Sequence, residues 1–133
     1  MIAVPATTMP SAVNPLLLAL LSILMSVAAQ FTLKTGMSSQ PVQAMLGTPW
    51  GLGKLAGILF NPWVFGGFVL YGLGAVVWLS VLARWDVSKA YPLVGLGFVL
   101  TAVVGAALGE QIGGLRAAGI GLICLGVWAV ARS

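Results

Sequence analysis

The chain has 133 residues, of which 60% are hydrophobic and only 6% are charged, and its formal net charge is +4. About a quarter of the residues of a soluble domain are charged, so this chain lacks the charge needed to cover a water-facing surface. Its apolar runs are long enough for bilayer-spanning helices, which need roughly 20 residues each. The composition therefore predicts an all-α membrane protein with four transmembrane helices and no room for an extramembrane domain.

Ionisable and metal-ligating residues are too few for a catalytic or metal site. The chain has no His and a single cysteine, Cys124, so it offers neither a thiolate metal site nor an internal disulfide. The two acidic residues, Asp86 and Glu110, are too far apart in the sequence to form a local carboxylate pair. The basic residues lie singly at the ends of apolar runs, where lipid headgroups explain them better than nucleic acid does. We therefore expect no enzymatic role, no metal or cofactor, and membrane lipids as the surroundings.

The first apolar run predicts a span over about residues 14–34, which follows an extended tail of residues 1–12. No Lys or Arg precedes this run, whereas a cleaved signal peptide has a basic segment there, so we interpret the run as a span. The one long loop, residues 35–59, comes next and begins with helix-ending residues. Residues 49–59 place a tryptophan and several leucines beside Lys54, which fits either a short interfacial helix or a loop resting on the headgroups.

The second span is predicted over residues 61–83, because Asn61 and Pro62 are typical of a helix N-cap and the first helical position. Spans three and four are predicted over residues 90–108 and 115–131, and the short turns between them make consecutive spans antiparallel neighbours. No proline lies in the middle of a span, which argues against an ion site in a broken helix. All 133 residues are thus predicted to form a single four-span domain.

The Lys and Arg residues favour neither membrane orientation. Each side of the predicted topology has three of them: Arg84, Lys89 and Arg132 on the side of the termini, and Lys34, Lys54 and Arg116 on the other. Basic loop residues favour the cytoplasmic side, so this tie fits insertion in both orientations. It also fits one fixed orientation, decided by the N-terminal tail or by a position of Lys34 inside the membrane.

Polar residues recur at every fourth position of the first span: Ser22, Ser26, Gln30 and Lys34. This spacing places them on one face of a helix, and polar groups in a membrane are costly unless they face protein or a water-filled groove. The stripe is therefore a candidate substrate groove. The alternative is structural: both serines bond back to their own helix, Gln30 bridges helices, and Lys34 marks the membrane interface.

Small residues form two further stripes. Gly97, Thr101 and Gly105 recur every four residues in the third span, and Gly119 and Gly126 share one face of the fourth. Small residues let membrane helices approach closely, so we predict that both stripes pack helices, within the chain or between chains. Four thin helices cannot enclose a sizeable polar pathway. We therefore expect a homodimer, or a heterodimer with a homologous four-span subunit.

Three stretches of the chain show a family resemblance. They are the end of the first span from Ser26 to Lys34, the segment Ala90-Tyr91-Pro92 with Gly109-Glu110 further on, and the glycine-rich run from Gly119 to Val127. In this order they resemble the drug/metabolite transporter superfamily, in its EamA-like and small multidrug resistance branches. The resemblance covers about residues 14–131 and implies a half-size, multi-pass protein of the bacterial inner membrane that works as a dimer by alternating access.

Within that superfamily, the proton-coupled drug exporters have a glutamate in the middle of the first span and a tryptophan three residues after the Ala-Tyr pair. The aligned residues here are Ser26 and Val94. A serine hydroxyl cannot exchange a proton at physiological pH, so these departures argue against proton/drug antiport. Gln30, Lys34 and the Ala-Tyr-Pro sequence are more similar to the paired small subunits that flip undecaprenyl-phosphate-linked aminoarabinose.

That resemblance implies a transporter that moves a lipid-linked sugar or a similar amphiphile across the membrane. Ser22, Ser26, Gln30 and Tyr91 would line its groove, and Lys34 would hold the phosphate. An interfacial position is an equal alternative for Tyr91. Two other hypotheses stay open for the whole chain: a small multidrug-type exporter of cations or metabolites, and a non-transporting subunit of a larger membrane complex.

Overall fold

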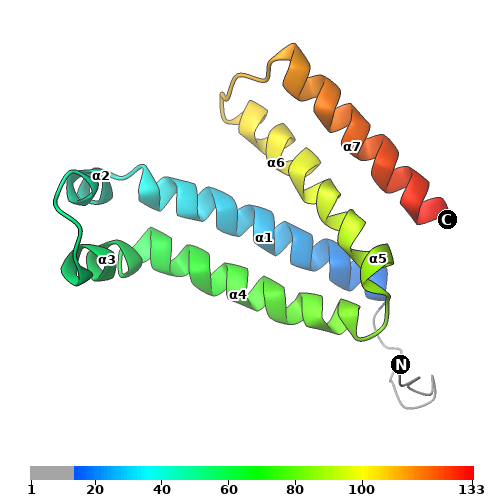
Figure 1. The fold of residues 1–133 in the computed structure, drawn as a ribbon, viewed down its shortest axis with the longest axis horizontal. Helices are drawn as coiled ribbons and strands as arrows, with labels where there is room; N and C mark the ends of the chain where they lie inside the picture. The colour runs from blue at the N-terminus through cyan, green and yellow to red at the C-terminus, as the bar shows by residue number, and fades with distance from the viewer. Residues whose placement is uncertain (1–13) are drawn as a thin grey trace.

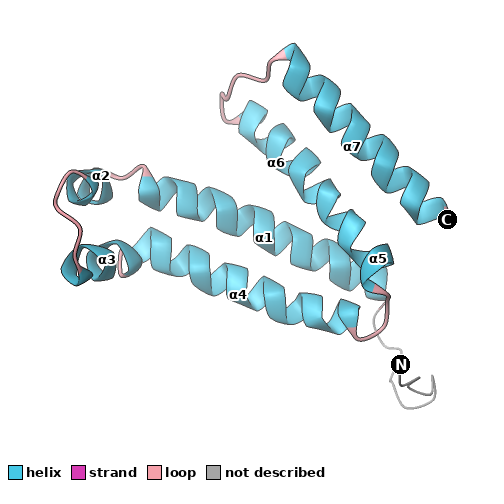
Figure 2. Cartoon of the chain, in the orientation of Figure 1, coloured by secondary structure: helices cyan, strands magenta, loops and turns pink. Residues whose placement is uncertain are grey.

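The computed structural model describes residues 14–133, and the predicted extended tail of residues 1–12 lies outside the described residues. The described chain consists of helices and the turns between them (Figures 1 and 2). In chain order the elements are α1 (Pro15–Met37), α2 (Gln40–Leu46), α3 (Leu52–Leu59), α4 (Pro62–Leu82), α5 (Val87–Ala90), the 3-10 helix η2 (Tyr91–Val94), α6 (Gly95–Ala107) and α7 (Gly114–Arg132). Four segments are long and apolar enough to cross a membrane: α1, α4, α7 and the run Val87–Ala107. The predicted fold class is therefore confirmed.

The two longest helices, α1 and α4, begin with the same local arrangement, an asparagine followed by a proline. The Asn14 side chain accepts a hydrogen bond from the backbone N–H of Leu16 at 2.9 Å, and Asn61 accepts one from that of Trp63 at 3.1 Å. The first N–H groups of a helix have no intrahelical partner, so an asparagine cap satisfies them and a proline at the first position loses nothing. The start of each helix is thus set locally by its sequence.

The long loop predicted over residues 35–59 contains two short helices, and the prediction needs correction in its first half. α1 continues past Gly36 to Met37, and Pro41 lies in the first turn of α2. A proline is tolerated there because the N–H it lacks would have had no partner. Both α2 and α3 run across the ends of α1 and α4 rather than alongside them (Figure 1).

The third span, predicted over residues 90–108, corresponds to the membrane-span candidate Val87–Ala107 and is made of shorter helical segments. It consists of α5, η2 and α6 in succession. Pro92 lies inside η2, and a proline ring removes one hydrogen bond and crowds the preceding turn, which the tighter 3-10 geometry accommodates. The chain therefore changes helix type at Tyr91 and Pro92, beside the site described below.

The main packing interface is between α1 and α4, which contact each other along their length. Glycines of α4 permit the close approach: a Cβ atom at Gly67 would lie 2.7 Å from Cγ of Leu33, and one at Gly74 would lie 3.3 Å from Cβ of Met25. Small residues at such crossings are the usual way in which membrane helices pack closely. A packing role was predicted from the sequence for glycines of the third and fourth spans, but not for these glycines of α4.

A glycine turn connects α6 to α7. Gly109 has φ +98°, the left-handed conformation that glycine adopts without strain. The N–H of Glu110 donates to the carbonyl of Gly105 at 2.9 Å, and that of Gly109 donates to Ala106 at 3.1 Å, which is the Schellman pattern of a helix end. The turn sends α7 back along α6, and α7 packs mainly on α6 and η2.

Candidate functional site

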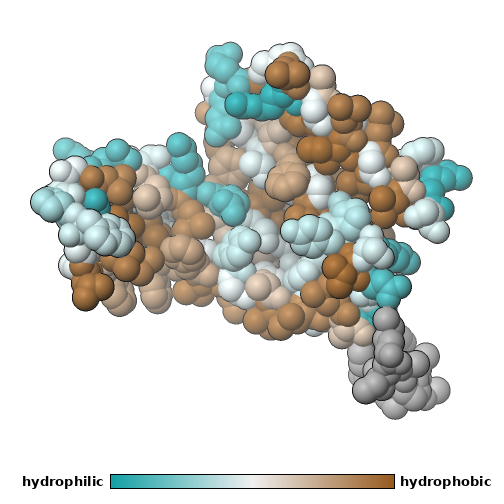
Figure 3. Space-filling view, viewed as in Figure 1, coloured by the Kyte–Doolittle hydropathy of each residue, from teal (hydrophilic) through white to brown (hydrophobic). Residues whose placement is uncertain are grey.

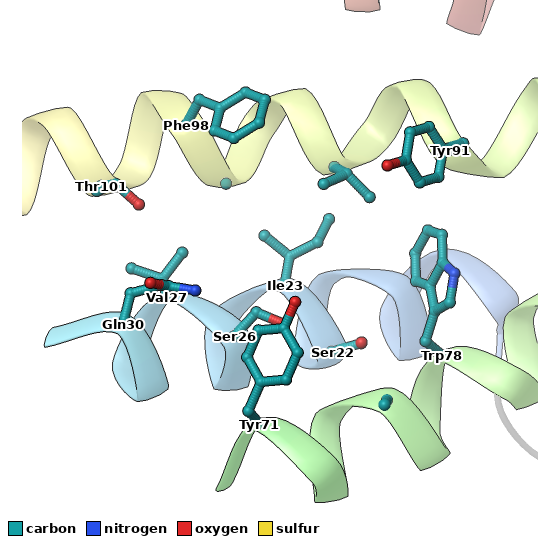
Figure 4. A pocket seen from close by; sticks show the side chains of 13 residues that line it. Ser22, Ile23, Ser26, Val27, Gln30, Tyr71, Trp78, Tyr91, Phe98 and Thr101 are labelled. Atoms are coloured by element: carbon teal, nitrogen blue, oxygen red, sulfur yellow. The ribbon is translucent and has the colours of Figure 1, made fainter. Parts of the chain in front are cut away.

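A cavity of about 560 Å³ lies where α6 and η2 diverge from the α1–α4 pair. Residues of α1, α4, η2 and α6 form its walls (Figure 4). They are Ser22, Ile23, Ser26, Val27, Gln30, Tyr71, Ala75, Trp78, Tyr91, Val94, Gly97, Phe98 and Thr101. The structure therefore brings four of the five predicted groove residues to one cavity.

The polar wall of the cavity comes from the stripe on α1. Ser22 is 4% exposed, and its hydroxyl donates a 2.7 Å hydrogen bond to the backbone carbonyl of Gly74 on α4. Ser22 thus joins two helices at the edge of the cavity, and its bond runs to α4 rather than back to its own helix as the structural alternative supposed. Ser26 and Gln30, one and two turns further along α1, line the cavity beyond it.

The opposite walls are aromatic. Tyr71 and Trp78 extend from α4 and Tyr91 lies on η2, whereas the ring of Phe98 lies on the side of α6 away from α1 (Figure 4). Sequence reasoning identified Tyr91 and missed the two aromatic residues of α4. Their seven-residue separation, which places both on one helix face, was the available signal.

Lys34 does not line the cavity. It lies one turn, about 6 Å along the axis, beyond Gln30 on the same stripe, and its side chain is exposed in the last turn of α1. The predicted polar stripe thus has two parts: three residues inside the cavity and a cation beyond its end, toward α2.

The stripe on α6 has three different surroundings. A Cβ atom at Gly97 would lie 3.3 Å from Cγ2 of Ile23, so Gly97 packs α6 against α1. Thr101 lines the cavity. A Cβ atom at Gly105 would collide with the carboxylate of Glu110, which folds back over this glycine. The three equally spaced residues therefore have different roles: Gly97 lies at a helix contact, Thr101 at the cavity and Gly105 at the helix end.

The two glycines of the α7 stripe have open space where a side chain would extend. A Cβ atom at Gly119 or Gly126 would meet no atom within 4 Å. Leu122, Leu125 and Trp128 of the same helix are also exposed. Close packing of side chains among residues 14–133 therefore does not account for these glycines.

One side of the cavity is open between α4 and α6. Among the described helices, α6 packs on α1 and α7, and α4 packs on α1. Tyr91 and Phe98 line the cavity and are still 64% and 62% exposed. Figure 3 shows less hydrophobic residues gathered in the space between these helices, with apolar surface on both sides. In a bilayer this opening faces laterally, because its walls are membrane-spanning helices.

The amino-acid sequence of the chain is similar to those of known membrane proteins. The chain is 34% identical over 118 residues to the probable 4-amino-4-deoxy-L-arabinose-phosphoundecaprenol flippase subunit ArnF of Proteus mirabilis, across 86% of this chain and 89% of that protein. It is 42% identical over 75 residues to the probable subunit ArnE of the same kind of flippase from Pseudomonas savastanoi pv. phaseolicola. That second match covers 56% of this chain and 66%, just under two thirds, of the relative.

No family model and no solved structure matches the chain. The resemblance to paired flippase subunits, expected from the α1 stripe and the Ala-Tyr-Pro sequence, is confirmed by the relatives. Their names describe subunits of transporters and not enzymes. Since the Proteus relative is matched over most of its length, the chain belongs to the family of 4-amino-4-deoxy-L-arabinose-phosphoundecaprenol flippase subunits.

Proposed function

We propose that the chain is one subunit of a two-subunit flippase that moves a lipid-linked sugar phosphate across the bacterial inner membrane. The observation that supports this most directly is the shape and chemistry of the cavity. It has a hydroxyl and amide wall on α1, aromatic walls opposite, and a lateral opening between α4 and α6. A lipid-linked sugar needs such a site, because its headgroup must cross the bilayer while its isoprenoid chain stays among the lipids.

The sugar would occupy the cavity. Ser26 and Gln30 supply hydrogen-bonding groups for sugar hydroxyls. The rings of Tyr71 and Tyr91 supply flat apolar faces with a polar tip for the edges of the sugar ring. The isoprenoid chain would leave through the α4–α6 opening, where the exposed ring of Phe98 provides an apolar border.

Lys34 would hold the phosphate just beyond the cavity. The phosphate of such a substrate lies between the sugar and the lipid chain, so its binding site must adjoin the cavity rather than fill it. Lys34 continues the polar stripe at this position and is exposed. An ammonium group there would neutralise the phosphate while the sugar contacts Gln30, one turn deeper.

A homologous four-span subunit would cover the open surfaces. The relatives are named as two kinds of flippase subunit, ArnE and ArnF. A Cβ atom at Gly119 or Gly126 of α7 would meet no atom of the described chain within 4 Å, and glycines on a transmembrane helix allow a second helix to approach closely. We place the heterodimer contact on the face of α7 that these glycines share.

Replacement of Lys34 tests the phosphate assignment. We expect Lys34→Ala to abolish flipping and Lys34→Arg to retain a substantial part of it, because the charge and not the side-chain length is needed. The measurement reconstitutes the chain with its homologous partner in vesicles that contain 4-amino-4-deoxy-L-arabinose-phosphoundecaprenol. A membrane-impermeant amine reagent then reports which leaflet holds the sugar amine.

Lys89→Ala is the matched control, because Lys89 is a second cation near a span end that does not line the cavity. It should flip substrate at the rate of the unaltered protein. Normal flipping by Lys34→Ala, with equal amounts of protein in the vesicles, would refute the role of Lys34.

The aromatic walls also favour a second candidate, export of an organic cation, because Tyr and Trp rings attract cations. The chain lacks a carboxylate in α1 for coupling such export to protons. Resistance of cells to toxic quaternary amines would separate the two functions: the exporter predicts a resistance that requires Trp78, and the flippase predicts none.

A further inference from the structure

The helix α3 has an apolar face that the described chain covers only in part: Leu55 and Leu59 are 37% and 38% exposed. Leu52, Leu55 and Leu59 follow each other at helical spacing and are all exposed, Leu52 by 85%. Trp50 just before the helix and Phe60 just after it are also exposed, by 77% and 74%. None of the residues of α3 is buried.

The other side of α3 packs on α2. A Cβ atom at Gly57 would lie 2.6 Å from the sulfur of Met45, so this glycine is the contact point of the two short helices. The Lys54 ammonium group donates to the carbonyls of Leu46 and Thr48 at 3.3 and 3.1 Å. Lys54 thus holds the end of α2 to α3. Its charge is directed at carbonyl groups on the side away from the leucine face.

Contacts between neighbouring residues of the chain set the position of α3 relative to α4. The N–H of Asn61, the cap of α4, donates to the carbonyl of Ile58 at 3.2 Å, so α4 begins where α3 ends. The rings of Phe60 and Phe65 stack with their centroids 6.1 Å apart. Since Phe65 is an exposed residue of α4, a candidate membrane span, this ring pair joins exposed apolar side chains at the end of α3 to those at the start of α4.

Tryptophan–cation pairs mark three places in the chain, each with the cation four residues after the tryptophan. Lys89 lies over the ring of Trp85 at 4.6 Å, Arg132 over Trp128 at 5.2 Å, and Lys54 over Trp50 at 6.0 Å. The first two pairs lie at the ends of membrane spans. Tryptophan and basic residues concentrate at the two membrane–water interfaces, and the third pair is at α3.

We propose that the segment α2–α3, residues 40–59, is an interfacial anchor whose partner is the lipid bilayer itself. The leucine face of α3 would lie among the acyl chains next to the headgroups of one leaflet, with the helix axis in the membrane plane. Burial of apolar side chains would hold it there. Anionic lipid is not required, because the one cation of this segment faces carbonyl groups of its own chain.

Spin labels on neighbouring positions of α3 test this in the full chain. In a Cys124→Ala background, Leu52→Cys and Leu55→Cys place a label on the leucine face. Gly53→Cys is the matched control: it lies about 100° around the helix from Leu52, and a Cβ atom there would meet nothing within 4 Å. Accessibility to oxygen, which partitions into lipid, is compared with accessibility to a water-soluble nickel chelate in phosphatidylcholine vesicles.

We expect a ratio of oxygen to nickel accessibility that is several-fold higher at Leu52 and Leu55 than at Gly53, and unchanged when phosphatidylglycerol is added. High nickel accessibility at all three positions would overturn the proposal. Protection from both reagents at the leucine positions would also overturn it, because protein would then cover the face. A high ratio only with phosphatidylglycerol would refute apolar anchoring. None of these readouts depends on flipping.

Discussion

The two serines of the α1 stripe have different surroundings, although their positions in the sequence are equivalent. Ser22 is buried and bonds to the carbonyl of Gly74 on α4, whereas Ser26 is partly exposed in the cavity. A buried hydroxyl that joins two helices contributes to stability. A hydroxyl in an open cavity is available to a ligand. One stripe therefore contains a structural residue and a candidate binding residue.

We therefore expect the serine-to-alanine substitution to have different effects at these two positions. Ser22→Ala should lower the stability of the protein by about 1 kcal/mol, the net value of a hydrogen bond. Ser26→Ala should leave stability unchanged and reduce flipping. Thermal unfolding in detergent and the leaflet assay measure the two effects. A loss of stability in Ser26→Ala that equals that of Ser22→Ala would contradict the assignment.

At the scale of helices, glycines with similar spacing have unlike roles. Gly67 of α4 lies directly under Leu33 of α1, whereas Gly126 of α7 faces open space. A glycine on a membrane helix allows a second helix to approach closely. Among the described residues, a Cβ atom at Gly67 would meet a neighbouring helix, whereas one at Gly126 would meet none.

Substitution of valine for each of these two glycines therefore gives a matched pair of variants. Gly67→Val should destabilise the subunit by about 1–3 kcal/mol, as expected for overpacking of a tight contact. Gly126→Val should leave the stability of the single subunit unchanged and weaken association with the partner. Unfolding of the isolated chain and native mass spectrometry of the co-expressed pair measure the two effects. An undiminished heterodimer in Gly126→Val would exclude this α7 face as the interface.

At the scale of the whole molecule, the chain is built as two unequal pairs of helices. α1 and α4 form the principal packed unit, and α6 with α7 diverges from it to leave the cavity open on one side (Figure 1). A cavity with one missing wall can bind a headgroup but cannot isolate it from both leaflets in turn. The proposed flippase function would therefore need a second subunit to alternate the exposure of the site.

It follows that the isolated chain should not flip substrate. Reconstituted alone, it should show no change in the leaflet distribution of the lipid-linked sugar above protein-free vesicles. With a homologous four-span subunit present, flipping should appear, and the mass of the active species should equal one copy of each. Full activity from a preparation that contains only monomer would show that the single cavity is sufficient.

Local features made much of the fold predictable from the sequence. Charge content and apolar run length indicate four spans, and the Asn-Pro pairs at Asn14 and Asn61 mark two helix starts, because caps act within a few residues of the chain. The two short helices within residues 35–59 were less evident. A proline or glycine there is compatible with either a helix end or a first turn, so local sequence alone does not distinguish the two.

The four spans and the polar face of the first span can both be read from the amino-acid sequence. Helical periodicity is a property of each segment alone, so it needs no knowledge of neighbours. The packing of the helices was needed to show that Tyr71 and Trp78 line the same cavity as this face, and that Lys34 does not line it. It was also needed to show that a Cβ atom at Gly119 or Gly126 would meet no described residue within 4 Å. Periodicity says which residues share a face, but what that face contacts depends on how the other helices pack around it.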